Sequence, residues 1–409
     1  MTGDRGLEAA FRVAYVTATL IMLGLSWPLW VEPSALPRVP FFAGLPTSTP
    51  AVSWALFLGI LGLLAASVLG DWPRRTLAAS AVLLAGLILQ DQHRFQPWAY
   101  QAIVMALALS IAGRGGGLSL CRAFLIGLYL HSGLSKLDVS FLRELGPAFL
   151  GAGGRLLGLD PAGLPGWART ALILAMPAAE IAVAVGLSFR KTRRVGMIGA
   201  VLIHAILIAL LGPWALRQST IVLVWNLSVM AQVAILFGPP STPRSDTPIP
   251  AQPAAFRAAA VAIGILLVLP FVERLGWFDS WPSFALYASH AERLEVRIAV
   301  TDEEELGTSA SSCLFPIPGT PWKRLDLTAW SRSVRGTPAY PQNRANVGLA
   351  LGVLGRPGRP ITFRAILQGR AHPISGRRDA EEIDTFADLE SRAGRYRLNA
   401  RPAPEPRDR

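Results

Sequence analysis

Long apolar runs separated by short polar segments occupy the first 275 residues of the chain. A helix needs about 17–25 mostly apolar residues to cross the hydrocarbon core of a membrane. The pattern therefore predicts an all-α polytopic transmembrane bundle of about nine helices, in a cytoplasmic or inner membrane. The runs lie at 11–31, 52–70, 76–90, 97–113, 118–135, 169–189, 195–212, 218–237 and 256–275.

The pattern changes after Gly276, where charged residues become frequent and the apolar runs shorten. Apolar and polar residues alternate at 294–300 and at 361–367, which is the period of a half-buried strand. Leu325 and Leu327 hint at a third strand. The predicted division of the chain is a transmembrane domain at 1–276, a smaller β-rich extramembrane domain at 277–400 and a disordered tail at 401–409.

Four further segments receive a local prediction. Proline and polar residues fill 239–253, which is predicted to be a loop between two membrane runs. Residues 141–150 are expected to form a helix lying in the membrane interface, and 151–166 a flexible loop. Residues 380–393 are expected to form a short helix.

Lysine and arginine gather in short loops that would share one side of the membrane. Short cytoplasmic loops of membrane proteins hold an excess of these residues. The densest group is 190–194, and Arg74, Arg75 and Arg114 agree with it when the N-terminus is cytoplasmic. Nine spans then place the C-terminal domain outside.

Composition supports the membrane class and removes several others. Hydrophobic residues make up 52% of the 409 residues and charged residues 16%, which is too apolar for one soluble domain. The net charge of +12 comes with no nucleic-acid-binding motif, so membrane lipid is the predicted partner and nucleic acid is not. No phosphate-binding, nucleophile-elbow or zinc-protease motif is present. The five histidines lack helical pair spacing, and no metal site is predicted.

Polar residues within or beside the apolar runs are candidates for a functional site, because a charge in the hydrocarbon region costs free energy and needs a partner. The helical rise of about 1.5 Å per residue puts some at the outer end of the bundle and others about 12–16 Å deeper. They predict an outward-opening polar pocket, roofed by the β-rich domain, in which Glu180 pairs with Lys136, a histidine or Arg122. The catalytic candidates are Lys136, His204 and His131, and the substrate-binding candidates are Glu180, Asn226, His93 and Gln96.

Each candidate also has a structural interpretation. Lys136 at a helix end can extend its ammonium group to the membrane interface. His204 and Asn226 can join neighbouring helices through hydrogen bonds. His93 and Gln96 fit a hydrated turn before a helix with an aromatic belt. The residues alone leave both interpretations open.

The segment Gly133-Leu134-Ser135-Lys136-Leu137-Asp138, followed by Phe141, resembles the G-x-x-K-L-D stretch of the vitamin K-dependent γ-carboxylase-like membrane domain, or HTTM domain. Its G-x-x-K-L part is also similar to the signature of the DoxX and MauE group of membrane proteins. His204, with the apolar run and Gly212-Pro213-Trp214 after it, is similar to a histidine helix of the carboxylase-like domain. The resemblance covers about residues 10–290.

This resemblance implies a role for two residues. Lys136 would be a base that acts with a reduced quinone, and His204 would stabilise charge or position the substrate. Ser135 stands where the carboxylase motif has a neighbouring lysine. A quinone or quinol is the cofactor that the resemblance implies.

Two functions of different classes remain open. The first is a membrane enzyme, of a quinol-linked lyase or oxidoreductase type, that binds a lipid-soluble small molecule and uses Lys136 for proton transfer. The second is a non-catalytic accessory protein that anchors or helps assemble an exported protein through the β-rich domain. The change Lys136→Arg would abolish the first function and leave the second, because arginine does not deprotonate.

Overall fold

The computed structural model describes residues 2–31, 36–42, 44–46, 48–112, 116–239, 254–355 and 360–396. Arg114, the predicted tail at 401–409 and nearly all of the predicted loop at 239–253 lie outside these residues. The chain folds as two compact units. Unit 1 comprises Met1–Leu23, Ile60–Val82 and Pro97–Ser289, and unit 2 comprises Gly24–Gly59, Leu83–Gln96 and His290–Arg409.

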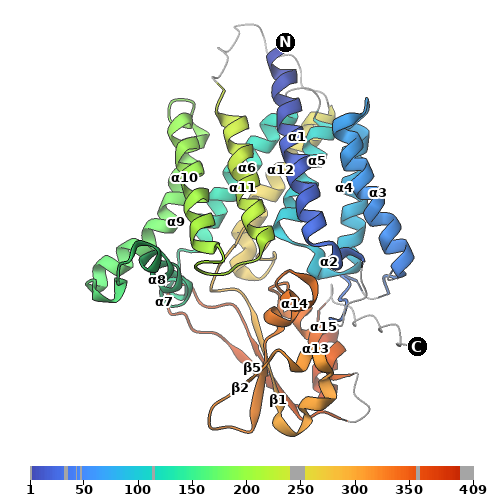
Figure 1. The fold of residues 1–409 in the computed structure, drawn as a ribbon, viewed down its shortest axis with the longest axis vertical. Coiled ribbons are helices and arrows are strands. Elements are labelled where there is room, and N and C mark those ends of the chain that lie inside the picture. Colours follow the sequence, from blue (N-terminus) through green and yellow to red (C-terminus); the bar gives the residue numbers. More distant parts are fainter. Residues whose placement is uncertain are drawn as a thin grey trace. The chain divides into compact units, whose positions relative to one another are not determined.

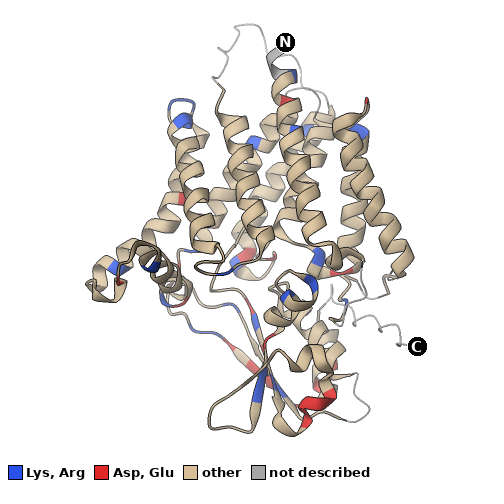
Figure 2. Cartoon of the chain, viewed as in Figure 1, with Lys and Arg blue, Asp and Glu red and all other residues tan. Residues whose placement is uncertain are grey.

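Long helices form at each of the nine apolar runs (Figure 1). Seven are long and apolar enough to cross a membrane, and α4 and α5 are not among the seven. Figure 2 shows that charged residues are sparse along these helices. By helix length and hydropathy, the chain is a multi-pass integral membrane protein. The helices are α1 (Thr2–Leu25), α3 (Pro50–Leu69), α4 (Pro73–Gln90), α5 (Pro97–Ile111), α6 (Gly116–Ser135), α9 (Gly166–Ser188), α10 (Arg193–Leu211), α11 (Thr220–Phe237) and α12 (Ala254–Val268), which continues as the 3₁₀ helix η3 (Leu269–Leu275).

Glycines allow the helices of unit 1 to approach closely. Helix α6 packs against α5, α9 and α12. A Cβ atom on Gly133 of α6 would lie 2.8 Å from the carbonyl oxygen of Pro177 on α9. A Cβ atom on Gly186 of α9 would lie 3.0 Å from the Cα atom of Gly196 on α10. Such small residues are common at helix contacts in membranes, where backbones can then meet.

The predicted interfacial helix at 141–150 forms as two helices, α7 (Val139–Arg143) and α8 (Leu145–Leu157). Asp138 begins α7, because its carboxylate accepts a hydrogen bond from the Phe141 amide at 2.7 Å. The predicted flexible loop from 151 is wrong as far as Leu157, since α8 ends only where Gly158 takes a left-handed conformation with φ 68°. Figure 1 shows α8 lying across the direction of α9 and α10.

The last part of unit 2 contains an antiparallel five-stranded sheet in the order β2-β3-β1-β4-β5. The two strands predicted from alternation are confirmed, and the third is confirmed as far as Leu325. Leu327 instead begins a helix, which Asp326 caps through the Ala329 amide. The strands are β1 (Arg293–Ala299), β2 (Leu314–Pro316), β3 (Trp322–Leu325), β4 (Phe363–Gln368) and β5 (Ala380–Ile383).

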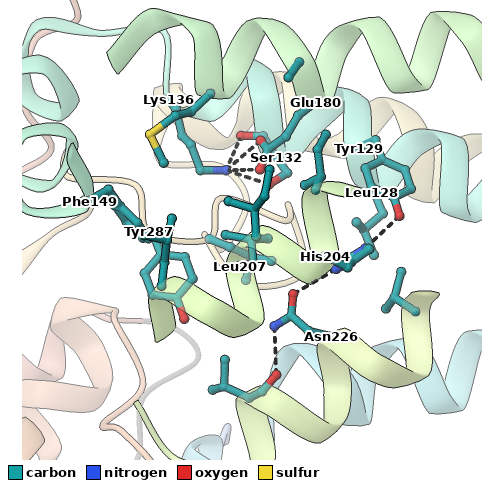
Figure 3. A pocket seen from close by; sticks show the side chains of 18 of the residues that line it. Leu128, Tyr129, Ser132, Lys136, Phe149, Glu180, His204, Leu207, Asn226 and Tyr287 are labelled. Carbon is teal, nitrogen blue, oxygen red and sulfur yellow. Dashed lines mark hydrogen bonds and ion pairs between the residues drawn. The ribbon is translucent and has the colours of Figure 1, made fainter. Parts of the chain in front are cut away.

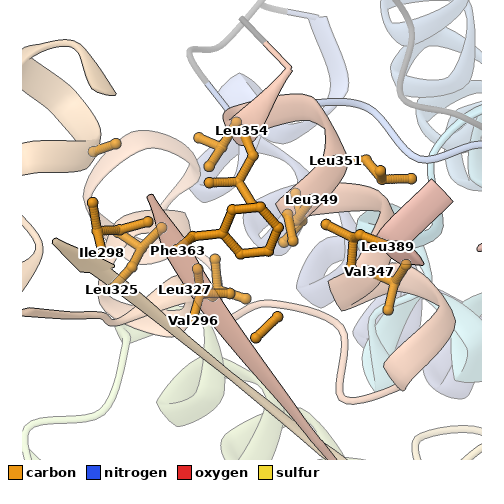
Figure 4. Packing of buried hydrophobic residues seen from close by; sticks show 14 of the residues in the cluster. Val296, Ile298, Leu325, Leu327, Val347, Leu349, Leu351, Leu354, Phe363 and Leu389 are labelled. Atoms are coloured by element: carbon orange, nitrogen blue, oxygen red, sulfur yellow. The ribbon is translucent and has the colours of Figure 1, made fainter. Parts of the chain in front are cut away.

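Helices complete this unit and enclose its core. The prediction of one helix at 380–393 is wrong at its start, because residues 380–383 pair with β4 as a strand. Figure 4 shows Val296, Ile298 and Phe363 from the sheet packed with Leu349 and Leu354 of α15. The helices are α2 (Trp27–Val31), α13 (Thr308–Ser311), α14 (Leu327–Arg335), α15 (Asn343–Leu354) and α16 (Phe386–Gly394).

Candidate functional site

A cavity of about 260 Å³ lies within unit 1 among α6, α9, α10 and α11. Its wall is mostly apolar, from residues such as Leu128, Phe149 and Leu207. Four of the seven predicted site residues also line it. These are Lys136, Glu180, His204 and Asn226.

Lys136 and Glu180 form an ion pair in the wall of this cavity (Figure 3). The Lys136 Nζ atom lies 2.7 Å and 3.0 Å from the two carboxylate oxygens of Glu180. It also donates to the backbone oxygen of Ser132 at 2.9 Å and to its hydroxyl at 2.7 Å. The side chains are only 7% and 11% exposed. Lys136 therefore points back along α6 into the bundle, and the interpretation that it extends to the interface is wrong.

The negative end of α6 helps to hold the Lys136 ammonium group. The last carbonyl groups of a helix have no partner within the helix and favour a nearby cation. Ser132 supplies one such carbonyl oxygen. The predicted pairing of Glu180 is confirmed with Lys136 as the partner, so the cost of burying each charge is offset by the other.

A second set of polar side chains in the cavity joins three helices by hydrogen bonds. Asn226 on α11 donates from Nδ2 to the Val222 carbonyl at 2.8 Å, which leaves its Oδ1 to accept from His204 Nδ1 at 2.8 Å. In the neutral ring the Nε2 atom of His204 then accepts, and the Tyr129 hydroxyl oxygen of α6 lies 2.7 Å from it. These contacts fit the neutral tautomer of His204 that carries its proton on Nδ1, and Figure 3 shows both hydrogen bonds of the ring.

Tyr129 and Ser132 were not among the predicted site residues, although the sequence contains a signal for both. They precede Lys136 at spacings of seven and four residues, which places all three on one face of α6. Trp225 and Tyr287 also line the cavity. Trp225 donates from its indole nitrogen to Gln101 Oε1 at 2.7 Å, a contact between distant segments that no local pattern indicates.

His131 does not line the cavity, so the structure does not bring this catalytic candidate together with Lys136 and His204 there. Its ring nitrogen Nε2 lies 2.8 Å from the Leu267 carbonyl oxygen of α12. The ring also meets Phe271 edge-on, with centroids 4.8 Å apart. Helical geometry is the reason, because a two-residue offset from Tyr129 turns the side chain about 200° around α6.

His93 and Gln96 also do not line the cavity, and both belong to unit 2. Their segment is not a hydrated turn, because residues 91–94 are at most 1% exposed. The Asp91 carboxylate accepts from Arg335 at 2.8 Å and lies 3.1 Å from His93 Nδ1. The Arg94 side chain donates to three carbonyl groups, those of Leu29, Trp30 and Leu87.

The groups around Asp91 set its charge and that of His93. Burial alone would raise the pKa of the Asp91 carboxyl, but Arg335, His93 and Arg94 together hold it below its usual value. Burial lowers the pKa of His93, against the opposing effect of Asp91. The contacts of residues 91–96 give this segment a structural role, because they join the early segments of unit 2 to its C-terminal part.

Asp138 of the G-x-x-K-L-D segment points away from the lysine. Its Oδ1 atom caps α7 through Phe141, and its Oδ2 atom accepts from Arg274 at 3.2 Å. Arg274 also donates to the carbonyl oxygens of Leu134 and Ser135. The segment therefore separates its two charges, with Lys136 paired to Glu180 and Asp138 paired to Arg274.

The cavity wall includes residues that are also exposed on the surface of unit 1. Ala175 and Ala179 of α9 and Ile206 of α10 line it and are exposed, Ile206 by 56%. All three are apolar and lie on helices long enough to span a membrane.

No group of three or more His, Cys, Asp or Glu side chains that could hold a metal ion occurs in the part of the chain that the structure describes. The chain matches no protein-family model, no curated protein and no solved structure. The resemblance of the G-x-x-K-L-D segment to the carboxylase-like and DoxX-like group stays a prediction.

Proposed function

We propose that this protein is a membrane enzyme that binds a lipid-soluble molecule in the cavity and exchanges a proton with it. The buried Lys136–Glu180 ion pair in the wall of a mostly apolar cavity is the observation that supports this proposal. Ionisable residues inside a membrane bundle are costly and usually serve a function. An apolar pocket with a few convergent polar groups is the usual form of a small-molecule site.

The size of the cavity limits the ligand. An engineered protein cavity of about 150 Å³ accepts benzene, so 260 Å³ has room for about ten non-hydrogen atoms. A ring head group such as that of a quinone or quinol is of this size. Its apolar tail would leave through the opening beside Ala179 and Ile206, directly into lipid.

The geometry divides the roles of the two charged residues. Lys136 is an ammonium donor to Ser132 and Glu180 and has no lone pair in this state. The Glu180 carboxylate is the group that accepts a proton. A ligand hydroxyl would transfer its proton to Glu180, keep the bonding electron pair on its own oxygen, and present the resulting anion to Lys136.

His204 contributes a hydrogen-bond donor and an acceptor to the wall of the same cavity. Its hydrogen bonds to Tyr129 and Asn226 hold the ring and its tautomer in place. In this proposal Tyr129 and His204 position the ligand and do not take the first proton. This differs from the role of base that the family resemblance implies for Lys136.

The proposal includes membership in the carboxylase-like and DoxX-like group. Gly133 lets α6 meet α9 where Glu180 follows Pro177, and Lys136 then reaches Glu180, so the glycine and the lysine of the segment act together. It also includes a cytoplasmic N-terminus, supported by Arg74, Arg75 and 190–194 at the ends of the helices. A reporter fused after Arg409 tests this orientation, since it would be active only outside.

The test is mass spectrometry of small molecules extracted from the detergent-purified protein. The wild type is compared with the double variant Lys136→Ala, His204→Ala and with the matched control Lys191→Ala, His372→Ala, which changes the same residue types outside the cavity. A stoichiometric quinone or other apolar ring compound in the wild type and control, lost in the first variant, is expected. Phospholipid alone in every sample would overturn the proposal and favour the accessory role.

A further inference from the structure

A cleft at one end of unit 1 gathers four arginines from two segments distant in the sequence. Arg5 and Arg12 come from α1, and Arg74 and Arg75 come from the first turn of α4. Trp72, Glu8 and Asp71 also line this arginine cleft, whose volume is about 660 Å³. The residues that line it carry four positive and two negative charges.

Among the described residues, few contacts of these arginine side chains are found. Glu8 and Arg12 stand four residues apart on α1, a spacing that favours ion pairs, yet no ion pair joins them among the described residues. The Arg12 Nε atom is buried and has no hydrogen-bond partner among the described residues. Arg75 lies over the Trp72 ring, 4.7 Å from its centroid, and makes a contact that leaves its N–H groups available.

Helix geometry adds to the positive potential of the cleft. Arg74 and Arg75 follow Pro73 at the start of α4, where the unpaired amide groups of a helix attract anions and repel cations. Two arginines at this place are unfavourable by themselves. An anion between them and α1 would remove this repulsion.

The position of the cleft points to a lipid as the source of that anion. Candidate membrane spans run over Arg5–Leu25 and Pro50–Leu69, so the cleft lies where spans meet the head-group region. Arg12 is about 10 Å along α1 from Arg5, at a depth where an arginine without a partner is costly. Leu69 is 86% exposed and Trp72 64% exposed beside the cleft, and acyl chains would cover both.

We infer that the arginine cleft binds the phosphate head group of an anionic phospholipid. Basic hollows between membrane helices are known to take such head groups. The inference is independent of the proposed reaction, because none of the cleft residues lines the Lys136 cavity.

The test uses native mass spectrometry of the full-length protein after delipidation in detergent. Phosphatidylglycerol and phosphatidylcholine with identical acyl chains are titrated into the wild type and into the double variant Arg12→Gln, Arg74→Gln. Each removed arginine should weaken phosphatidylglycerol binding about fivefold, hence about 25-fold for the pair, and leave phosphatidylcholine binding unchanged. Equal binding of the two lipids to the wild type would overturn the inference.

Two controls distinguish a built site from general attraction. The variant Arg190→Gln, Arg194→Gln removes the same charge where α9 connects to α10 and should keep the binding of the wild type. An equal loss of binding in this variant would contradict the cleft. The variant Arg12→Lys, Arg74→Lys preserves charge and should keep most binding, which separates loss of the site from loss of the fold. Displacement of the lipid by millimolar inorganic phosphate would assign the cleft to a free anion instead.

Discussion

The ammonium nitrogen of Lys136 lies 2.7 Å from a carboxylate oxygen of Glu180, although 44 residues separate them in the chain. Each charge is buried and is the main charge partner of the other. The pair is therefore both a stability element and the proposed proton-exchange group, and its two roles can be measured separately.

Loss of one partner should cost more than loss of both. The change Lys136→Met leaves the Glu180 carboxylate buried without a cation, which typically lowers the free energy of unfolding by about 3–5 kcal/mol. In the double variant Lys136→Met, Glu180→Leu most of this loss should return, because no charge then remains to be buried. Thermal unfolding in detergent measures both, and additive losses in the double variant would contradict the coupling.

A side chain at Gly133 should push α6 away from α9. The Cβ atom of Gly133→Ala would lie 2.7 Å from Ile181 Cγ1 and 2.8 Å from the Pro177 carbonyl oxygen. Overpacking of this kind costs about 1–3 kcal/mol, so the unfolding temperature should fall by several degrees. Gly62→Ala is the matched control, since nothing lies within 4 Å of its added Cβ atom; an equal fall in both variants would refute the packing argument.

Tyr129 and Asn226 should be energetically coupled although they do not touch. Both bond to His204, at 2.7 Å and 2.8 Å, and the Asn226 bond sets which ring nitrogen can accept from Tyr129. The variants Tyr129→Phe and Asn226→Leu should each destabilise the protein by about 1–3 kcal/mol. Their double variant should differ from the sum by about 0.5 kcal/mol or more. If the two losses of stability simply add, His204 does not couple Tyr129 to Asn226.

His93 should make unit 2 less stable as the pH falls. Burial lowers the pKa of His93 below the unfolded value of about 6.5, so the unfolded chain takes up the proton first and low pH favours unfolding. The free energy of unfolding should then fall below pH 6.5, by at most about 1.4 kcal/mol per pH unit. The variant His93→Gln should flatten this slope between pH 7.5 and 5.5 in denaturant titrations. The exposed His372→Gln should keep it, and an unchanged slope in His93→Gln would refute the assignment.

A bulky residue at the proposed opening should exclude the ligand without removing the ion pair. Ala179 is exposed and lines the cavity, so Ala179→Trp should fill the gap between α9 and α10. The ligand recovered with the purified protein should decrease at least tenfold. Ala178→Trp, at an exposed position that does not line the cavity, should leave the recovered amount unchanged. Equal recovery from both variants would mean that the ligand enters by another route.

Long apolar runs predicted the helices, because a membrane span requires about 17–25 mostly apolar residues in succession and this can be read directly from the sequence. Each of the nine runs became a helix, and the alternation at 294–300 and 361–367 became paired strands. Two errors occur where short-range capping decided the outcome, and a third occurs at 380–383, where pairing with β4 forms a strand. Asp326 begins a helix where Leu327 had suggested a strand, and α8 continues to the left-handed Gly158.

The ion pair in the site was also predicted from the residues themselves. Lys136 and Glu180 were expected to need partners, since any buried charge does. Which partner each finds depends on how α6 and α9 meet at Gly133. The interpretation of the His93 segment as a hydrated turn was wrong, because Arg335, more than 200 residues later, pairs with Asp91 and the segment is buried.

The sequence by itself determined that the chain forms apolar helices of membrane length, that a sheet region follows them, and that Lys136 and Glu180 could not stay unpaired. These properties depend on the hydropathy and charge of neighbouring residues. The tertiary structure decided that Tyr129, His204 and Asn226 share a cavity with that ion pair, that His131 turns away from it, and that four arginines meet in one cleft. Such arrangements depend on close contacts between helices distant in the sequence, which no local pattern encodes.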